Sequence, residues 1–407
     1  MDFLDLQFAK RRRWLATTLI AFVLLSFGKV AAESAAAAAS HRGSPQTLRV
    51  GTHRAIKTIA QAATLARDGD TVEVDAGSYV NDVAVWQQDN LTLRAVGGRV
   101  RLQVNGVSAE GKSIWVIRGG RIHVEGFDFS GARVADRNGA GIRFEKGSLT
   151  VQHCSFVNNE MGLLTGNDER AELTVENSEF AHNKRPDGHN HNLYVGRIAR
   201  FSMSGSYIHH GHIGHLLKSR ARVNHIVNNR LTDEATGRAS YELEFPDGGV
   251  AYVIGNIIGQ SRSTENPVLI SFGAEGYKWP VNQLYLVNNT LANDRLYGGS
   301  FLRVRAGADD VTAINNLLLG PGHLEHAGAS DFRNNFSAGA EAFEGVATGN
   351  FRLKIASGLA GRAIDPGTAN GQDLRLYSEY VHPMTLAKLS APAQNPGALQ
   401  RSGQPRP

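Results

Sequence analysis

Basic and histidine side chains gather in one part of this 407-residue chain. Eight of the fifteen histidines fall between His182 and His225, and Lys218 and Arg220 lie within the same stretch. Histidine and lysine transfer protons when burial or nearby charge brings their pKa close to the working pH, and arginine binds a carboxylate through two parallel hydrogen bonds. The stretch therefore carries residue types suited to removing a proton beside a carboxylate group.

A repeated pattern of strand residues determines where these side chains lie. Each copy ends in a large apolar residue, which we call the anchor, and the anchors are Phe156, Phe180, Ile208, Leu231, Ile258, Leu291 and Leu318. Successive anchors are 23 to 33 residues apart. A period of this length, built from strand residues with Asn and Gly between them, is typical of a solenoid whose turns bury their apolar side only by stacking on one another.

The position two residues before each anchor holds a small or amide side chain. The seven copies are Cys154, Ser178, Ser206, Asn229, Asn256, Asn289 and Asn316. Asn stacked on Asn can exchange amide hydrogen bonds between turns, and Asn tolerates the left-handed backbone of a bend. We expect a structural ladder here, with Cys154, the only cysteine, as a buried and unpaired thiol.

A second strand follows each anchor, and its alternation separates core from surface. We expect the core to receive Leu193, Val195, Leu217, Leu243, Phe245, Ile270 and Val304. The alternate positions then face outward, and they are Asn192, Tyr194, Lys218, Arg220, Glu242, Glu244, Leu269, Ser271, Arg303 and Arg305. With turns about 4.8 Å apart, Lys218 is expected beside Glu242, and Arg220 beside Glu244.

The start and end of the repeat region resemble a known fold family. Residues 54–67 carry the pattern of a short amphipathic helix, and Asp68-Gly69-Asp70-Thr71-Val72 and Gly77-Ser78-Tyr79 follow it. This order, with the closing segments Asn350–Leu353 and Pro396–Leu399, resembles right-handed parallel β-helix proteins of the pectate-lyase-like superfamily. The resemblance implies an all-β fold class, a single-stranded right-handed parallel β-helix over residues 47–400 with an N-terminal capping helix.

The segment around Lys218 carries a second resemblance. Lys218-Ser219, followed by Asn224, Ile226 and Asn228-Asn229, is similar to the strand that carries the basic residue in β-helix lyases of the chondroitinase B and alginate lyase type. In that family a Lys acts as base beside an Arg, and a Glu-x-Glu pair with an Asn holds calcium. The Glu pair precedes the Lys there, whereas Glu242-x-Glu244 follows Lys218 here, so the resemblance carries over Lys218 alone.

These observations favour a polysaccharide lyase that acts on an acidic, uronate-containing glycan by β-elimination. Lys218 is the expected base and Arg220 the group that neutralises the substrate carboxylate, with acid or alternative base among Tyr194, His191 and His215. The expected substrate-binding residues are His189, Asn192, His212, Glu242 and Glu244. We expect no required cofactor, and a divalent metal stays open, with His189 and His191, or His212 and His215, beside Asp187 as its candidate ligands.

Two other classes of function remain open. An inverting glycoside hydrolase needs two carboxyl groups roughly 6.5–9.5 Å apart, and Glu242 and Glu244 would lie about 7 Å apart on one strand face, with Asp247 as a further candidate. A non-enzymatic glycan-binding or adhesin-like solenoid is the other class, since a fold alone does not fix a function. The concentration of polar residues between 182 and 275 favours a local site over a uniform scaffold.

The ends of the chain indicate export. Lys10 to Arg13 form a basic region, residues 14–27 are apolar, and small residues follow at Val30-Ala31-Ala32, so residues 1–32 are expected to be a signal peptide. Residues 33–46 are an expected disordered lead-in and 401–407 a tail. Of the net charge of +5, about +2 remains after residue 32, which does not indicate a nucleic-acid partner. We expect a periplasmic or extracellular monomer of a Gram-negative bacterium, without a stable membrane partner.

Expression in a secreting bacterial host should release a protein that begins near Glu33, because the small residues up to Ala32 suit signal peptidase. N-terminal sequencing of the secreted protein measures this directly. A chain that keeps Met1 and sediments with membranes would show that residues 1–32 are an anchor instead.

Overall fold

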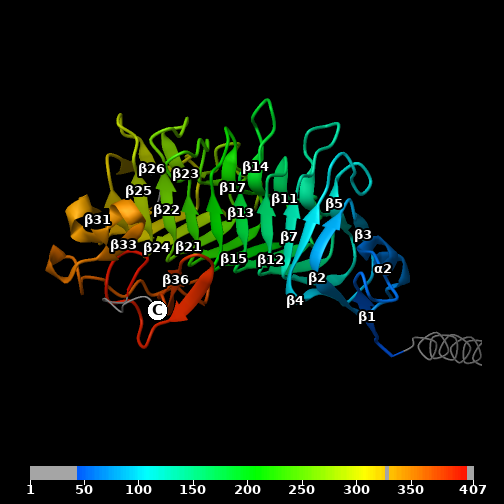
Figure 1. Ribbon diagram of the computed structural model, residues 1–407. Coiled ribbons are helices and arrows are strands. Elements are labelled where there is room, and N and C mark those ends of the chain that lie inside the picture. Colours follow the sequence, from blue (N-terminus) through cyan, green and yellow to red (C-terminus); the bar gives the residue numbers. More distant parts are fainter. Residues whose placement is uncertain (1–43, 326–329, 401–407) are drawn as a thin grey trace, which may run out of the picture. The chain divides into compact units, whose positions relative to one another are not determined.

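The computed structural model describes residues 44–325 and 330–400, and one compact unit begins at Thr47. The expected signal peptide, most of the lead-in and the tail at 401–407 lie outside the described residues. Figure 1 shows the unit as strands stacked coil upon coil.

Three rows of parallel strands build each coil. The first row holds the strand before the bend, and its members are β1 (Thr47–Val50), β2 (Thr71–Val80), β4 (Leu91–Gln103), β6 (Arg121–Glu125), β9 (Ser148–Gln152), β12 (Glu172–Glu176), β15 (Arg200–Ser204), β18 (Val223–Val227), β21 (Val250–Ile254), β24 (Gln283–Val287), β27 (Asp310–Ile314) and β30 (Ser330–Arg333). The second row holds the shorter strand after the bend, and its members are β7 (Phe127–Ser130), β10 (Ser155–Val157), β13 (Glu179–Ala181), β16 (Tyr207–His209), β19 (Arg230–Thr232), β22 (Ile257–Gln260), β25 (Thr290–Asn293), β28 (Leu317–Leu319) and β31 (Phe336–Ala338).

The third row forms a separate sheet. Its members are β3 (Ala84–Trp86), β5 (Ser113–Ile117), β8 (Ala140–Phe144), β11 (Met161–Thr165), β14 (His191–Val195), β17 (His215–Ser219), β20 (Leu243–Phe245), β23 (Val268–Phe272), β26 (Ser300–Val304) and β29 (His323–Leu324). These ten strands pair in chain order, each with the strand one coil earlier, whereas the first two rows join into one sheet of 21 strands. The described coils therefore form a parallel β-helix of about ten turns, and the expected fold class is confirmed.

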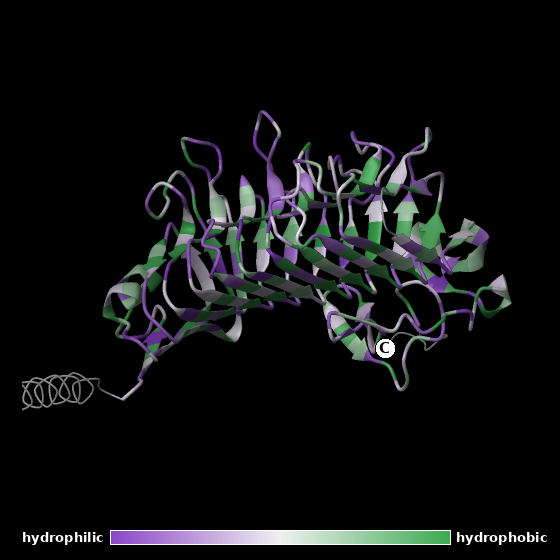
Figure 2. Ribbon diagram, turned by 180° about the vertical axis from the view of Figure 1, so that it is seen from behind, coloured by the Kyte–Doolittle hydropathy of each residue, from purple (hydrophilic) through white to green (hydrophobic). Residues whose placement is uncertain are grey.

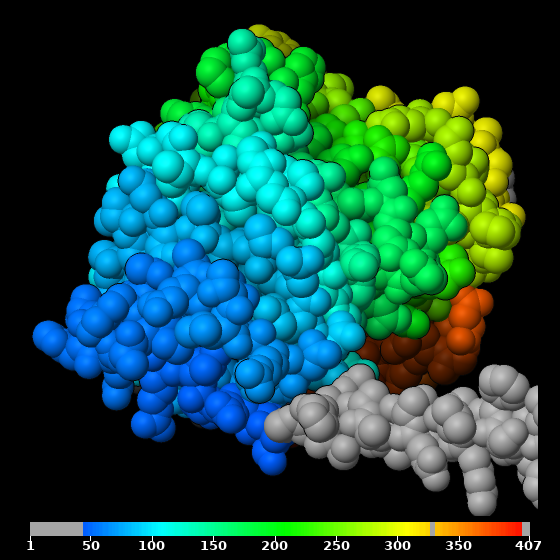
Figure 3. Space-filling model, turned by 90° about the vertical axis from the view of Figure 1, so that its right-hand side faces the viewer, coloured from blue at the N-terminus to red at the C-terminus, as the bar shows by residue number. Residues whose placement is uncertain are grey.

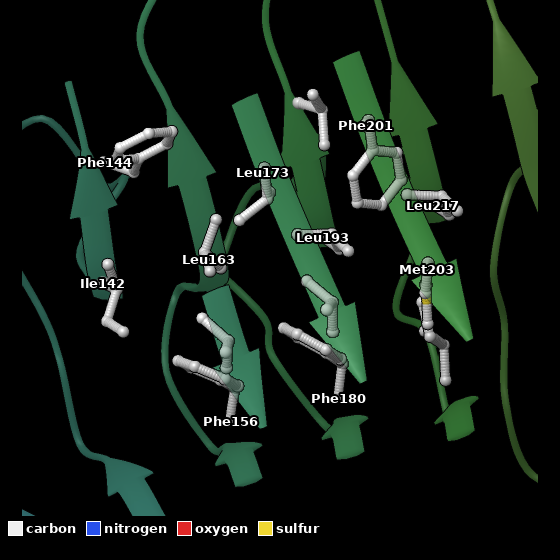
Figure 4. Packing of buried hydrophobic residues seen from close by; sticks show 14 of the residues in the cluster. Ile142, Phe144, Phe156, Leu163, Leu173, Phe180, Leu193, Phe201, Met203 and Leu217 are labelled. Carbon is white, nitrogen blue, oxygen red and sulfur yellow. The ribbon is translucent and has the colours of Figure 1, made fainter. Parts of the chain in front are cut away.

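The core is the inside of this coil. Leu193, Val195, Leu217, Leu243 and Phe245 are fully buried, as the alternation of the third row predicts. Figure 4 shows Leu163, Leu193 and Leu217 on successive coils, pointing toward the residues of the facing strands. The anchors stack in the same way, with the ring centroids of Phe156 and Phe180 4.7 Å apart. Like side chains thus repeat from coil to coil, which is how short turns share one core.

The predicted ladder is confirmed at the bend between the first two rows. Each member accepts the backbone N–H of the member one coil earlier, from Cys154 N to Ser178 Oγ at 3.1 Å up to Asn289 N to Asn316 Oδ1 at 2.9 Å. Asn335 adds a further step at 3.0 Å. The left-handed backbone lies one residue earlier than expected, at Asn228, Asn288 and Asn315 among others. The two residues of each Asn-Asn pair therefore have different roles. The first adopts the left-handed backbone of the bend, and the side chain of the second forms the ladder.

Burial of Cys154 follows from its place in this ladder. The thiol is completely buried and unpaired, and burial raises its pKa to about 12. It is therefore an inert structural thiol, as expected.

A short helix covers the first coil. The helix α2 runs from Ile59 to Leu65, shorter than the pattern over 54–67 predicts, and it buries Ile59 and Ala62. Thr58 caps it, and the Asp82 carboxylate accepts the backbone N–H groups of Ile59 at 2.6 Å and Ala60 at 2.8 Å. Figure 3 looks at this end, where the blue N-terminal residues lie over the cyan coils behind them.

The closing segments do not continue the coil. They are η1 (Ala340–Ala342), β32 (Phe343–Gly345), η2 (Val346–Thr348), β33 (Asn350–Leu353), η3 (Ile355–Ser357), β34 (Thr368–Ala369), β35 (Gln372–Asp373), β36 (Ser378–Val381) and β37 (Thr385–Lys388). Each named strand pairs in an antiparallel hairpin. The chain returns along the first two rows, and Asn228 Nδ2 donates to Ser378 Oγ at 2.6 Å.

Polar residues concentrate at the loops between the rows. Figure 2 shows hydrophilic loops along one edge of the stack and alternating hydrophobic bands within the strands.

Among the described residues, no helix has the length and apolar character needed to cross a membrane.

Replacing Asn256 by Ala should lower the free energy of unfolding by about 2–4 kcal/mol, because two buried backbone groups lose their partner at roughly 1–3 kcal/mol each. These groups are the N–H of Asn229, now 2.9 Å from Oδ1, and the carbonyl of Ile226, now 2.7 Å from Nδ2. Urea denaturation followed by circular dichroism measures the loss. The exposed Asn105→Ala variant is the control, and an equal shift in both variants would show that the ladder adds no stability.

Candidate functional site

The third row brings the basic stretch together on its outer face. Because β17 pairs with β20 in parallel register, Lys218 lies opposite Glu244, one coil further along. Its Nζ is 3.0 Å from Glu244 Oε2. On the other side, the register of β14 and β17 sets Tyr194 opposite Lys218. Three neighbouring coils therefore supply a tyrosine, a lysine and a glutamate at one level of the sheet.

A second carboxylate, that of Glu275, bridges the two cations of β17 and its following turn. Glu275 Oε1 accepts from Lys218 Nζ at 2.8 Å, and Oε2 accepts from Arg220 Nη2 at 2.7 Å. Glu275 lies in the loop after β23, and a backbone hydrogen bond to Pro246 holds that loop over β20. The Glu275 side chain is 46% exposed, against 11% for Lys218. A carboxylate thus sits between two cations at the boundary with solvent.

The guanidinium of Arg220 is fixed on its remaining sides. Its Nε donates to the Tyr194 hydroxyl at 3.0 Å, and its Nη1 pairs with the buried carboxylate of Asp247. Arg197 Nε donates to the other oxygen of Asp247 at 2.7 Å. We call Lys218, Arg220, Glu244, Asp247 and Glu275 the charged cluster.

Two histidines border the charged cluster. His215 Nδ1 lies 3.1 Å from Glu244 Oε2. The backbone N–H of His215 donates to His191 Nδ1 at 3.2 Å, so a neutral His191 carries its proton on Nε2. The His191 ring lies against both neighbours, with centroids 4.6 Å from His215 and 5.4 Å from Tyr194.

The positive and negative side chains of the charged cluster shift one another's pKa values. Burial opposes the charge of Lys218, but the Glu244 and Glu275 carboxylates outweigh it and raise its pKa. Burial alone would raise the pKa of Glu244, but His215 and Lys218 lower it. For Glu275, burial is likewise outweighed by Lys218 and Arg220, so its pKa is lowered. Each cation therefore faces an ionised carboxylate, and together with Arg197 the charged cluster has three cations for three carboxylates.

The pKa values of the two imidazoles are shifted in the opposite direction from that of Lys218. Burial lowers the pKa of His191 well below its usual value, and the charges of His215 and Lys218 lower it further. Burial also lowers the pKa of His215, against the opposing effect of Glu244. Near pH 7 both rings are neutral while Lys218 is protonated. An ammonium held by two carboxylates has no lone pair to offer, so the prediction that Lys218 is the base requires Lys218 to lose its proton first.

The expected neighbours of Lys218 and Arg220 are wrong, because the observed partners lie further along the chain. Lys218 pairs with Glu244 rather than Glu242, and Arg220 reaches Asp247 rather than Glu244. The reason is that β20 begins only at Leu243. Glu242 therefore belongs to the preceding loop and turns inward, where it is completely buried. Burial raises its pKa well above the usual value, and Asp233 adds to the effect.

Three other residues expected on the outer face are buried, namely Asn192, Leu269 and Ser271. Asn192 is 1% exposed, and it accepts from Asn183 Nδ2 at 2.8 Å and donates to the His209 carbonyl at 2.8 Å. It is thus part of a second amide ladder with Asn159 and Asn183, and its predicted role in substrate binding stays a prediction. Leu269 is completely buried beside β20.

The remaining expected residues lie in the loops above the sheet. His189 is exposed in the loop before β14, and His212 is half-buried in the loop before β17. Within the described residues, neither side chain forms a hydrogen bond or ion pair with the charged cluster. Asp187 pairs with Arg185 at 2.7 Å and Arg137 at 3.2 Å, so its carboxylate is already engaged.

Sequence analysis missed Glu275 and Arg197. Glu275 lies between glycines in a loop, Gly273-Ala274-Glu275-Gly276, and nothing in that pattern distinguishes it from an ordinary surface glutamate. Its place depends on the loop folding back over the preceding coil. Arg197 lies just after β14, where only the path of the turn decides that it meets Asp247.

A cavity of about 480 Å³ lies on the first row instead, within the size range of small-molecule pockets. Tyr252, His225, Arg200 and Arg222 contribute to its wall. Among the described residues, no Lys, Asp or Glu lines it. The cavity wall thus offers Arg, His and Tyr side chains without a carboxylate, whereas the third row combines these types with carboxylates. We therefore take the charged cluster with its histidines as the candidate active site.

Comparison with known proteins identifies the fold. No family model matches the chain, and no curated protein matches it significantly. The crystal structure of the pectate lyase Pel9A is similar, with a TM-score of 0.62 and 13% identity over 89% of this chain and 98% of that chain. A structure of ORF18 from Geobacillus virus E2 matches with a TM-score of 0.45 and 14% identity, covering 67% of this chain and 53% of that chain. The pectin methylesterase from Aspergillus niger matches with a TM-score of 0.33 and 13% identity, covering 80% and 93%. The chain has the right-handed parallel β-helix fold of pectate-lyase-like proteins.

Proposed function

We propose that this protein is a carbohydrate-active enzyme, and specifically a lyase that cleaves an acidic, uronate-containing glycan by β-elimination. One observation carries the proposal: the exposed carboxylate of Glu275 occupies the space between Lys218 and Arg220. A uronate carboxylate has the same charge and the same two acceptor oxygens. A substrate that displaces Glu275 would therefore find a site already shaped for a carboxylate.

Holding the substrate carboxylate prepares the adjacent carbon for reaction. As a proton leaves C5 of the uronate, negative charge develops on the carboxylate, and two fixed cations stabilise that charge more than they stabilise the ground state. Lys218 and Arg220 are such cations, since Glu244 and Asp247 hold them in place. Their role in this proposal is to bind and neutralise the carboxylate.

His215 is the proposed base. His215 Nδ1 lies 3.1 Å from Glu244 Oε2, and a neutral ring that keeps its proton on Nδ1 beside this carboxylate has its lone pair on Nε2. His215 Nε2 takes the C5 proton, the C5–H electrons form the C4–C5 double bond, and the bond from C4 to the glycosidic oxygen breaks. Glu244 is a positioning residue, because it acts through His215.

Tyr194 is the proposed acid. Its oxygen accepts a hydrogen bond from Arg220 Nε, which leaves its own O–H free to donate. That proton passes to the departing glycosidic oxygen and completes the elimination without water. His191 stacks against Tyr194 and accepts from the backbone of His215, so it keeps acid and base at a fixed separation.

The other functions have less support. A hydrolase would need an accessible, protonated carboxyl group. Glu242 has a raised pKa but is completely buried, whereas Glu244 and Glu275 are held ionised by cations.

Pel9A, which shares this fold, is named a pectate lyase, and that name agrees with an acidic glycan as substrate. We also propose that the protein is exported, since polymeric glycans of this kind lie outside the cell.

Incubation with a panel of uronate polysaccharides should produce the ultraviolet absorbance of an unsaturated uronate. Lys218→Ala and Arg220→Ala should each lower kcat/KM roughly 100-fold, and His215→Gln and Tyr194→Phe should lower kcat by roughly 100-fold to 10,000-fold. His123→Gln, a histidine near Glu125 on β6, is the matched control and should keep full activity.

The pH profile separates the two possible bases. If His215 is the base, kcat/KM should decline as the pH falls through its pKa, which burial holds below the usual value. If Lys218 were the base, kcat/KM would keep rising above about pH 10, because the Lys218 pKa is raised. New reducing ends without ultraviolet absorbance would indicate a hydrolase, and tight glycan binding with no product a binding protein.

Replacing Glu275 by Gln should lower KM for the uronate glycan about fivefold and leave kcat nearly unchanged, because a competing, partly exposed ion pair worth about 1 kcal/mol is removed. Initial rates at varied substrate concentration measure the change. Glu110→Gln is the matched control, since Glu110 bridges Lys112 and Arg118 on a remote coil with similar exposure. A higher KM in Glu275→Gln would show that Glu275 organises the cations and does not stand in for the substrate.

A further inference from the structure

Three histidines that the proposed reaction does not use come together on the second row. One ring nitrogen from each of His182, His209 and His210 lies within 4.8 Å of the others. His209 is the last residue of β16, His210 follows it, and His182 follows β13 one coil earlier. From this arrangement we propose that His182, His209 and His210 form a binding site for one transition-metal ion of the Zn²⁺ class.

The strand register makes the meeting of these rings a property of the fold. Ala181 of β13 pairs with His209 of β16, so His182 and His210 occupy equivalent positions on adjacent coils. Their rings stack with centroids 4.4 Å apart. The His209 ring lies edge-on to both, with centroids 5.8 Å from His182 and 4.8 Å from His210. Each of the three rings is therefore in contact with the other two, and each brings one nitrogen to the same place.

An adjacent carboxylate orients the buried member. His209 Nε2 lies 3.1 Å from Glu179 Oε1, and Ser155 Oγ donates to the other Glu179 oxygen at 2.9 Å. A neutral His209 that donates from Nε2 has its lone pair on Nδ1, the nitrogen that faces His210. Histidines that bind metals almost always donate their second ring N–H to a carboxylate, carbonyl or water. Glu179 occupies that place here.

The backbone does not require histidine at these positions. Phe129 takes the place of the anchor in the coil before Phe156. The residue two after this position has positive φ in four successive coils, at Gly131 (90°), Asn158 (61°), His182 (56°) and His210 (49°). Glycine and asparagine satisfy the left-handed bend in the first two coils. Two imidazoles in the next two coils, beside a third on the strand, add a ligand set that the fold does not need.

The ligand chemistry selects the ion. Imidazole suits Zn²⁺, Cu²⁺ and Ni²⁺, whereas Ca²⁺ and Mg²⁺ require oxygen ligands. Zinc binds imidazole nitrogen at about 2.0–2.1 Å, so the rings must close in slightly, and the exposed His182 ring has room to move. Three protein ligands leave a fourth tetrahedral position for water. The ion would then join the coils of β13 and β16.

Titration calorimetry of the untagged, EDTA-dialysed protein with ZnCl₂ tests the site. We expect one Zn²⁺ per chain, no competition from excess CaCl₂, and a rise in the thermal unfolding temperature on zinc addition. The double variant His182→Asn/His210→Asn should lose both responses, and asparagine keeps the bend intact. Glu179→Gln should weaken Zn²⁺ binding roughly 10-fold to 100-fold.

His153→Asn is the matched control, because His153 is exposed and has positive φ at a different bend. It should bind Zn²⁺ like the unaltered protein, and circular dichroism confirms that every variant is folded. Absence of saturable binding would overturn the proposal, as would equal binding by the double variant and the control, or displacement of Zn²⁺ by CaCl₂. None of these outcomes depends on whether the protein is a lyase.

Discussion

The hydrogen bond from one coil's backbone N–H to the next coil's amide side chain is the constraint on which this structure depends. A coil of two to three dozen residues cannot enclose a core of its own, so its stability comes from its two neighbours. The ladder from Cys154 to Asn335 ties successive bends together at 2.9–3.1 Å. Every strand after a bend inherits its register from that contact. The anchors, the third row and the loops above it follow in turn.

Register then determines the chemistry of the candidate site. Tyr194, Lys218 and Glu244 come from three coils and share one level of the sheet only because each strand pairs in step with the last. The loop carrying Glu275 adds a carboxylate that no strand supplies. With Arg197, three cations face three carboxylates, so the site holds its cations in place in the absence of a ligand. Under the proposed function, such a site would select by exchange of one carboxylate for another and not by general attraction of anions.

The sequence predicted the parts of the structure that repeat. Asn229, Asn256 and Asn289 stack as expected, and the core positions of Leu193, Leu217 and Leu243 follow from strict alternation. Prediction failed where a strand begins late or a loop changes direction. Glu242 precedes β20 and turns inward, although the alternation of Leu243 and Phe245 would carry it outward.

Long-range contacts from loops were beyond the reach of pattern analysis for the same reason. Glu275 meets Lys218 and Arg220 across more than fifty residues, by a path that depends on how its loop packs against Pro246. Tyr194, Lys218 and Arg220 were correctly grouped because they lie on the repeating strands. The role of Lys218 as the base stays a prediction, and the raised pKa of Lys218 depends on two carboxylates whose positions the sequence left open.

The return of the C-terminal segment over the coils sets an order on folding. Ladder bonds join residues 19 to 33 apart, so coils can add one after another as the chain lengthens. The bond between Asn228 and Ser378 spans 150 residues, and Asn288 binds the carbonyl of Asn395 across 107. The central coils therefore stand partly uncovered until residues 378–395 have been synthesised. Completion of this solenoid waits for a segment that closes over coils made long before it.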